Sequence, residues 1–301
     1  MKYMPLIAAI FIAGLSACTK KASFYDSSKA RFHDSFFEDF NTSASGYFEH
    51  HSGGNSADFT WAFGVPSPSE PGTNILSFKI DPEDPAGAGR GPEIISNDFT
   101  HFGTYAARLK VPDVRGIQPN VGVVVGYFTY YMSSEQGLSE IDWEWLIADP
   151  EIIYVGTWTG PRGSLKRIGR TINMAEGIIY STTYRVGHDG ERSPLTGIQN
   201  QPETIPAIEG YDASKQFHTY GFDWYPDRIR WWMIHPISAD TVVLWDYQGS
   251  QVGIPPNHTR YRLNYWHTNN WPVHTNPNSI EKPLQPYELE VDWMSYDPME
   301  E

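Results

Sequence analysis

The sequence predicts an all-β protein, built as a sandwich or a barrel. Short runs of alternating apolar and polar residues recur along the whole chain, as expected for strands with one buried face. The 26 Gly and 23 Pro residues lie mostly between these runs, where turns need them. The sequence has no helical stripe of apolar residues longer than about three turns. Many short strands without intervening helices indicate two packed sheets or a closed barrel.

The predicted strands follow one another along most of the chain. Each combines period-two alternation with flanking turn residues. Their ranges are 75–80, 105–111, 121–131, 139–145, 219–224, 228–234, 241–245 and 288–296.

The composition describes a folded, acidic protein that is rich in aromatic residues. Hydrophobic residues make up 40% and charged residues 19% of the 301 residues, which excludes a disordered chain. A net charge of −14 argues against a nucleic-acid-binding protein, because such proteins need a cationic surface. The single cysteine excludes a disulfide framework and a cysteine-based zinc site. The aromatic fraction of 15% suits sugar binding as well as core packing, since Tyr and Trp offer flat apolar faces with a polar edge.

Residues 1–17 have the features of an export signal. A basic residue precedes an apolar stretch, 6–15, that is too short for a permanent membrane span. The run Leu15-Ser16-Ala17-Cys18 resembles the lipobox of bacterial lipoproteins. The resemblance implies cleavage before Cys18 and lipidation of that cysteine; the alternative is an ordinary cleaved signal that contains a cysteine. We therefore expect an exported lipoprotein of the outer membrane, on its periplasmic or cell-surface face, that meets the membrane only through its lipid anchor.

The remaining chain divides into a tether and one large domain. Residues 18–30 are polar and small, and we expect them to be a lipid-anchored tether. Residues 31–298 carry all predicted strands and form the domain. One stretch within it, 160–209, has six basic against five acidic residues and few clear strands. Because loops of this length are usually functional or disordered, this insertion is either a functional loop or a solvated excursion.

An acidic strand carries the predicted chemistry. In the run Ser139-Glu140-Ile141-Asp142-Trp143-Glu144-Trp145, side chains alternate between two faces. Glu140, Asp142 and Glu144 share one face, and the apolar residues share the other, which belongs in the core. Crowding of three like charges raises at least one carboxyl pKa.

Glycoside cleavage requires a carboxylic acid with a raised pKa beside an ionised carboxylate. The alternative is the solvated outer face of an edge strand. Spacing leaves the stereochemistry open, because residues four apart on a strand are ~13 Å apart, whereas a retaining pair of carboxyl groups needs ~5–5.5 Å.

The acidic strand and several other segments resemble glycoside hydrolase family 16. The run Glu140-Ile141-Asp142-Trp143-Glu144 is similar to the E-I-D-x-E strand of that family. The likeness to the bacterial lichenases (endo-β-1,3-1,4-glucanases) of the family spreads over most of the chain. In chain order, the other matching segments are 35–41, 102–110, 128–130, 210–215, 217–224, 264–266 and 291–293.

The resemblance implies a fold, a mechanism and a set of site residues. The fold would be a concanavalin-like jelly-roll β-sandwich with a concave substrate cleft. The mechanism would be a retaining double displacement without a cofactor, with Glu140 as nucleophile, Glu144 as general acid/base and Asp142 tuning their protonation. Substrate-binding residues would be Glu93, Phe128, Tyr130, Asn264, Trp266 and Trp271, with Trp158 where the family has Asn. Each aromatic residue could instead be core filler.

The resemblance also implies a structural Ca²⁺ site. Asp292 matches a family aspartate that holds the ion together with backbone carbonyl groups, here from near Asp39 and Gly72. Oxygen ligands at a surface site suit a hard cation. The alternative is a solvated aspartate on a strand.

Two departures from the family bear on the substrate. Ile95 stands where the family has Arg, and Leu138 stands where it has Trp. We expect a monomeric endo-β-glucanase that acts on a polysaccharide. The departures leave open which glycosidic linkage it cleaves. One alternative is a transglycosylase on the same scaffold, with a xyloglucan or β-glucan acceptor. The other is a non-catalytic carbohydrate-binding jelly roll, against which the intact acidic strand argues.

Overall fold

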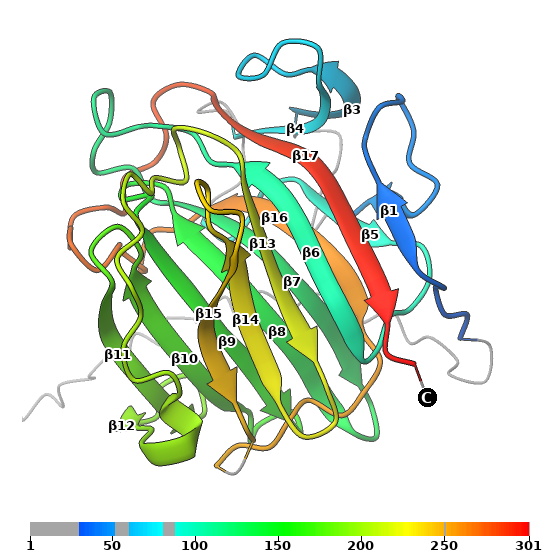
Figure 1. Cartoon of the computed structure of the whole chain (residues 1–301), viewed down its shortest axis with the longest axis vertical. Coiled ribbons are helices and arrows are strands. Elements are labelled where there is room, and N and C mark those ends of the chain that lie inside the picture. Colours follow the sequence, from blue (N-terminus) through cyan, green and yellow to red (C-terminus); the bar gives the residue numbers. More distant parts are fainter. Residues whose placement is uncertain (1–29, 52–59, 81–87, 250, 301) are drawn as a thin grey trace, which may run out of the picture.

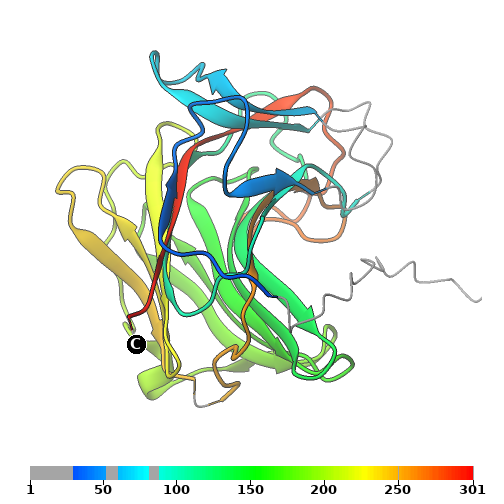
Figure 2. The same cartoon turned by 90° about the vertical axis from the view of Figure 1, so that its right-hand side faces the viewer.

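A computed structural model describes residues 30–51, 60–80, 88–249 and 251–300. Two antiparallel sheets pack face to face, and Figure 2 shows these layers edge-on. Within the described residues the only helical element is the short 3₁₀ turn η3 (Gly197–Asn200), and none of their helices could cross a bilayer. The predicted all-β jelly-roll sandwich is confirmed. The export signal, Cys18 and most of the tether lie outside the described residues.

One sheet has eight strands and forms the front layer of Figure 1. Seven of them follow the order β15 (Thr241–Tyr247), β14 (Ile229–Ile234), β13 (His218–Trp224), β6 (Gly103–Lys110), β17 (Tyr287–Pro298), β4 (Asn74–Ile80) and β3 (Thr60–Pro66). The eighth, β1 (Phe36–Glu38), pairs with β17. The strands predicted between 75 and 111 and between 219 and 296 are all present here.

The other sheet has nine strands and carries the acidic strand in its middle. Its order is β12 (Ser193–Pro194), β11 (Ile178–Val186), β10 (Lys166–Asn173), β9 (Ile152–Gly160), β8 (Gly137–Leu146), β7 (Val123–Ser133), β16 (Arg260–His267), β5 (Glu93–Ser96) and β2 (Phe48–His50). It curves away from its partner, so that its outer face is concave (Figure 2).

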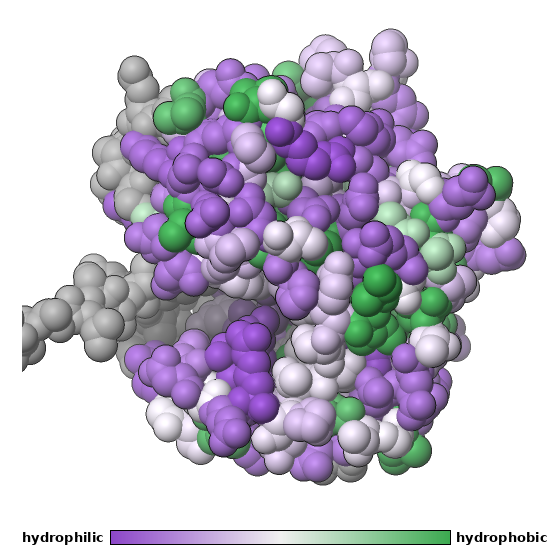
Figure 3. All heavy atoms as spheres, turned by 90° about the vertical axis from the view of Figure 1, so that its left-hand side faces the viewer, coloured by the Kyte–Doolittle hydropathy of each residue, from purple (hydrophilic) through white to green (hydrophobic). Residues whose placement is uncertain are grey.

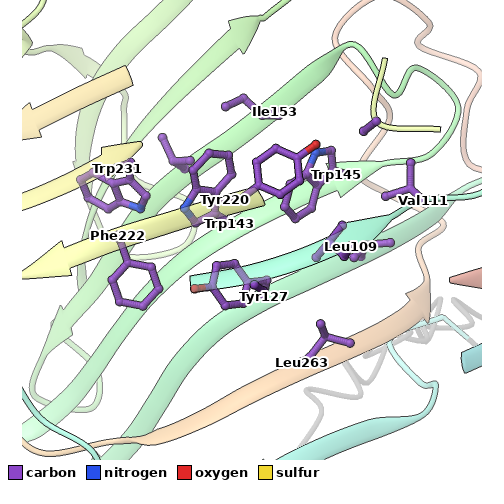
Figure 4. Packing of buried hydrophobic residues seen from close by; sticks show 14 of the residues in the cluster. Leu109, Val111, Tyr127, Trp143, Trp145, Ile153, Tyr220, Phe222, Trp231 and Leu263 are labelled. Carbon is purple, nitrogen blue, oxygen red and sulfur yellow. The ribbon is translucent and has the colours of Figure 1, made fainter. Parts of the chain in front are cut away.

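The core between the sheets fixes the acidic strand from behind. Trp143 and Trp145 of β8 are fully buried and stacked, with ring centroids 5.6 Å apart (Figure 4). Their partners come from the opposite sheet, where Tyr220 packs against both rings. The indole N–H of Trp231, also from that sheet, donates to the backbone carbonyl of Asp142 at 3.1 Å. Buried aromatic residues and a satisfied N–H thus hold the strand that bears the carboxylates.

The segment 160–209 is not the loop-like insertion that the sequence predicts. It contains β10, β11, β12 and η3, and these strands extend the nine-stranded sheet beyond β9. The alternation of β10 is disguised because Arg170 stands between Ile168 and Ile172 on the buried face. Its guanidinium donates to Thr182 and to three backbone or amide oxygens, and it lies 5.1 Å from the centroid of the Trp245 ring. A satisfied, stacked arginine occupies a position where the pattern requires an apolar residue.

Candidate active site

The three carboxylates of β8 lie on the concave face at the centre of the nine-stranded sheet. Strand β8 pairs with β7 on one side and with β9 on the other. Glu140 and Glu144 are partly exposed, whereas Asp142 is 5% exposed. The residues between them, Ile141 and Trp143, are fully buried against the other sheet. The edge-strand alternative is therefore wrong, because β8 is a central strand.

Burial and mutual repulsion raise the pKa of two of these carboxyl groups. Burial raises the pKa of Asp142 well above its usual range, and the charges of Glu140 and Glu144 raise it further. A protonated Asp142 can donate its hydrogen bond to an ionised Glu140. Burial also raises the pKa of Glu144 to about 7, against the lowering effect of the Arg167 guanidinium. Near neutral pH the site therefore contains proton donors beside an ionisable carboxylate, as acid-assisted glycoside cleavage requires.

A cleft of about 230 Å³ adjoins the carboxylates on the side of β7, β16 and β5. It brings together the three acidic residues and four of the predicted substrate-binding residues, namely Glu93, Phe128, Asn264 and Trp266. These side chains come from four strands that are adjacent in the sheet, although β5 and β16 are far from β7 and β8 in sequence. The volume and the aromatic lining suit a sugar ring.

Strand register explains how Asn264 reaches the carboxylates. Glu144, Gly126, Asn264 and Glu93 lie side by side on β8, β7, β16 and β5. A Cβ atom on Gly126 would lie 2.4 Å from the Asn264 side-chain oxygen, so only glycine allows this approach. That oxygen is buried and has no hydrogen-bond partner among the described residues. It is therefore available to accept a hydrogen bond from a sugar hydroxyl group.

Arg262 compensates for the missing arginine at Ile95. Residues Arg262 and Ile95 are direct neighbours in the pairing of β16 with β5. The Arg262 guanidinium donates to the Glu93 carboxylate at 2.6 Å and lies 5.1 Å from the centroid of the Tyr130 ring. Sequence reasoning missed Arg262, although it alternates in phase with Asn264 and Trp266. The neighbouring strand thus supplies the guanidinium that holds Glu93 in the cleft wall.

Three predicted aromatic residues lie outside this cleft. Tyr130 is opposite Glu140 on β7, beneath Arg262. Trp158 is opposite Glu140 on β9, but only 9% of it is exposed. Its ring lies against Arg167, Arg185 and His188, and its role in substrate binding stays a prediction. Trp271 packs edge-on against Tyr154, on the other side of the carboxylates.

Arg167 of the 160–209 segment has a partner that the sequence reasoning did not identify. It follows Lys166 at the start of β10, and its guanidinium forms an ion pair with Glu144 at 3.8 Å. The pairing of β10 with β9 places it opposite Trp158 and so on the concave face. The segment 160–209 therefore directly contacts Glu144, the predicted general acid.

The Arg167 contact predicts a change in pH dependence. The guanidinium favours the ionised form of Glu144 and so lowers its pKa. In Arg167→Gln the acid should stay protonated to higher pH, and the alkaline limb of kcat/KM should move to higher pH on a neutral aryl glycoside. Arg228→Gln, at an exposed ion pair with Asp246 next to β14, is the matched control. The charged groups around Glu144 in this interpretation are Glu140, Asp142 and Arg167. An alkaline limb of Arg167→Gln at the same pH as in wild type, or at a lower pH, would contradict it.

The predicted calcium ligand Asp292 is paired with an arginine. Asp292 sits at a β-bulge of β17, and its carboxylate accepts a hydrogen bond from Arg108 at 2.5 Å. Glu70 binds the same guanidinium at 2.8 Å. Among the described residues, no group of three or more His, Cys, Asp or Glu could hold a metal ion. One oxygen of the Asp292 carboxylate thus has an arginine as its positive partner.

Sequence comparison finds relatives that are named β-glucanases, although no protein-family model matches the chain. The β-glucanase of Bacillus licheniformis is 24% identical over 216 residues, which cover 70% of this chain and 70% of that protein. The β-glucanase of Bacillus subtilis is 23% identical over 241 residues, or 77% and 78% of the two chains. A xylanase/β-glucanase of Ruminococcus flavefaciens is 26% identical over 143 residues, which are 48% of this chain and 12% of that protein.

Solved structures share the fold at low sequence identity. A lichenase from a mouse hindgut metagenome has a TM-score of 0.52 and 22% identity, covering 89% of this chain and 100% of that one. A family 16 endo-glucanase of Bacteroides ovatus has a TM-score of 0.53 and 11% identity, covering 87% and 99%. The Crh5 transglycosylase has a TM-score of 0.51 and 15% identity, covering 89% and 85%.

The sandwich, the central acidic strand and the glucanase relatives agree with one another. Fold similarity alone does not carry an activity. Here, however, the carboxylates lie in a cleft on the concave face, and sequence relatives with the same name cover most of the chain. The chain therefore resembles glycoside hydrolase family 16: its sequence relatives are named β-glucanases, and it shares its fold with lichenase structures.

Proposed function

We propose that this protein is an endo-acting, retaining β-glucanase. The observation that carries the proposal is the triplet of carboxylates in a cleft, with the pKa of Glu144 raised to about 7. Glu140 attacks the anomeric carbon, the glycosidic C–O bond breaks, and Glu144 gives its proton to the leaving oxygen. Glu144 then takes a proton from water, whose oxygen attacks the same carbon and releases Glu140. Asp142 donates a hydrogen bond to Glu140 while that carboxylate is ionised.

Endo action is supported by surfaces on both sides of the carboxylates. The cleft with Glu93 and Asn264 lies toward β5, and on the other side of the carboxylates the concave face continues over β9, β10 and β11. A polysaccharide that crosses the concave face can therefore occupy both sides of an internal bond. Binding on both sides positions that bond against Glu140 and Glu144.

Product analysis on mixed-linkage β-glucan tests the proposal. Purified protein should release new reducing ends within the chain, so that viscosity falls before small sugars accumulate. Proton NMR should show that the first product has the β configuration at the new reducing end. Binding without any new reducing end would favour a carbohydrate-binding module, and α-configured first products would contradict retention.

The transglycosylase is the second candidate function. Its support is the structural likeness to the Crh5 transglycosylase, which shares the sandwich fold. The two activities differ only in whether water or a sugar hydroxyl group attacks the glycosyl-enzyme. Redistributed chain lengths at constant reducing-end concentration, when acceptor oligosaccharide is added, would favour the transferase.

We also propose that the protein is an exported lipoprotein, anchored through Cys18. The support is the lipobox-like run Leu15-Ser16-Ala17-Cys18. Cys18→Ser should move the protein from the membrane fraction to the soluble fraction, because acyl chains supply about 0.8 kcal/mol per buried CH₂ and a polar tether cannot replace them. Cell fractionation with mass spectrometry of the N-terminal peptide checks this. Wild-type protein that is wholly soluble, with an unmodified residue 18, would contradict the proposal.

The calcium prediction has a direct test. Because Arg108 already pairs with Asp292, we expect EDTA to leave the melting temperature of the wild type unchanged. Scanning calorimetry in EDTA and in excess Ca²⁺ measures this. A fall in EDTA that Ca²⁺ reverses, and that Asp292→Ala abolishes, would establish the site that the family resemblance implies.

A further inference from the structure

A basic pocket lies beside the carboxylates, on the concave face of β9, β10 and β11. Four arginines line it, Arg167, Arg170, Arg185 and Arg192. The Arg170 guanidinium is engaged in the core, whereas Arg167 and Arg185 lie directly opposite each other on β10 and β11. It lies across β8 and β9 from the cleft that contains Glu93. The surrounding edge of the molecule is mainly hydrophilic (Figure 3). Apart from Arg170, this leaves three arginines at the pocket of a chain whose net charge is −14.

The positive charge of this pocket is poorly compensated. Among the described residues, Arg185 and Arg192 form no ion pair, and the only carboxylate paired with Arg167 is Glu144. The Nε atoms of Arg167 and Arg185 are buried and have no hydrogen-bond partner. Like charges directly opposite each other in a sheet are destabilising, and unsatisfied buried donors add to the cost. Burial and the charges of Arg167 and Arg192 lower the pKa of Arg185, against a smaller raising effect of Asp189.

The framework holds the guanidinium groups in place. Arg167 and Arg185 both lie against the Trp158 ring, at 5.3 and 5.1 Å from its centroid. This stacking fixes their planes and reduces the entropy that binding would cost. Trp158 therefore has a role that sequence reasoning did not assign, as a support for two cations.

The shape of the pocket suits a small group. Its floor is opened by Gly169, whose Cβ would contact only Arg167 Nε and a backbone oxygen, both at 3.8 Å. The hydroxyl groups of Thr171, Ser181 and Thr183 complete the polar lining. The space for water-sized molecules is about 50 Å³, which holds a few waters or a compact substituent but no complete sugar ring.

We propose that this pocket binds an anionic substituent, a carboxylate or a sulfate group, on the sugar that lies across the scissile bond from Glu93. The inference rests on the proposed glycosidase function and specifies its substrate class as an acidic β-glycan. Arginine forks match the oxygen geometry of such groups and form short, charge-assisted hydrogen bonds. A bound anion would accept hydrogen bonds from the terminal N–H groups of the guanidinium forks and compensate the like-charged pair.

A matched pair of substrates tests the proposal. A mixed-linkage glucan oligosaccharide is compared with the same oligosaccharide carrying carboxylate at C6, and with a C6-sulfated version. The measured quantity is the ratio of kcat/KM on the charged substrate to kcat/KM on the neutral substrate. Wild type should favour one of the charged substrates, and Arg185→Gln should lower that ratio about tenfold or more. Arg185 is chosen because it makes no ion pair with Glu144.

Arg228→Gln is the matched control, since it removes the same charge outside the pocket and should keep the wild-type ratio. Whichever charged substrate gives the larger ratio identifies the substituent. A wild-type ratio below one for both charged substrates, or an Arg185→Gln ratio equal to that of wild type, would overturn the proposal.

Failure of the proposed function gives a different result. If wild type cleaves neither neutral nor charged glucans, the glucanase reading fails, and the pocket is tested with inorganic sulfate alone. Saturable shifts of the arginine Nε–H resonances, lost in Arg185→Gln, would support the anion site without any turnover. No saturable shift in wild type would overturn it.

Discussion

Glu140→Ala is expected to lower kcat on β-glucan by about 10⁴-fold or more, with the fold intact. The side chain lies on the concave face, while the buried face of β8 is formed by Ile141, Trp143 and Trp145 and does not change. The loss should be large because the glycosyl-enzyme cannot form without the carboxylate. Circular dichroism tests whether the fold is intact, and kcat on mixed-linkage glucan measures the loss of activity. Glu135→Ala, in the exposed turn before β8, is the matched control.

Chemical rescue separates a lost nucleophile from a damaged cleft. Azide can enter the space left by the Glu140 carboxylate and attack the anomeric carbon of an activated aryl glycoside. Because this is a single displacement, the product should be a glycosyl azide of inverted configuration. Near-normal activity of Glu140→Ala, or rescue with retained configuration, would show that another group is the nucleophile.

Glu144→Gln is expected to lower kcat/KM on β-glucan by about 10²- to 10⁴-fold, the usual contribution of a positioned general acid. The rate of glycosyl-enzyme formation from an aryl glycoside with a good leaving group should fall much less, because the oxygen of that leaving group departs without a proton. Comparing the two substrates under single-turnover conditions therefore isolates the proton-donor role.

The same variant should change the pH profile. The pKa of Glu144 is raised to about 7, so wild-type activity should fall as pH rises through that value and the acid loses its proton. Glutamine does not titrate, and the alkaline limb should disappear in Glu144→Gln. An alkaline limb that persists in the variant would assign it to another group, and Asp142 would be the next candidate.

The sequence by itself determined the fold class and the catalytic strand. Period-two alternation predicted most strands because a strand with one buried face must alternate. The acidic strand was found for the same reason, since Ile141, Trp143 and Trp145 could only face the core. Family motifs then added the cleft residues Glu93 and Asn264, which are far from the carboxylates in sequence.

Only the tertiary structure decided which neighbours surround those residues. The alternation of β10 was hidden by Arg170, because a buried arginine with satisfied donors is indistinguishable from a solvated one in a sequence. Cross-strand register placed Arg262 beside Glu93, and an extended sheet placed Arg167 beside Glu144. Arg262 and Glu93 are 169 residues apart in sequence, and local patterning does not specify which strands pair or in which register. The catalytic strand could therefore be recognised from the local sequence, whereas strand pairing determined which charged residues lie around its carboxylates.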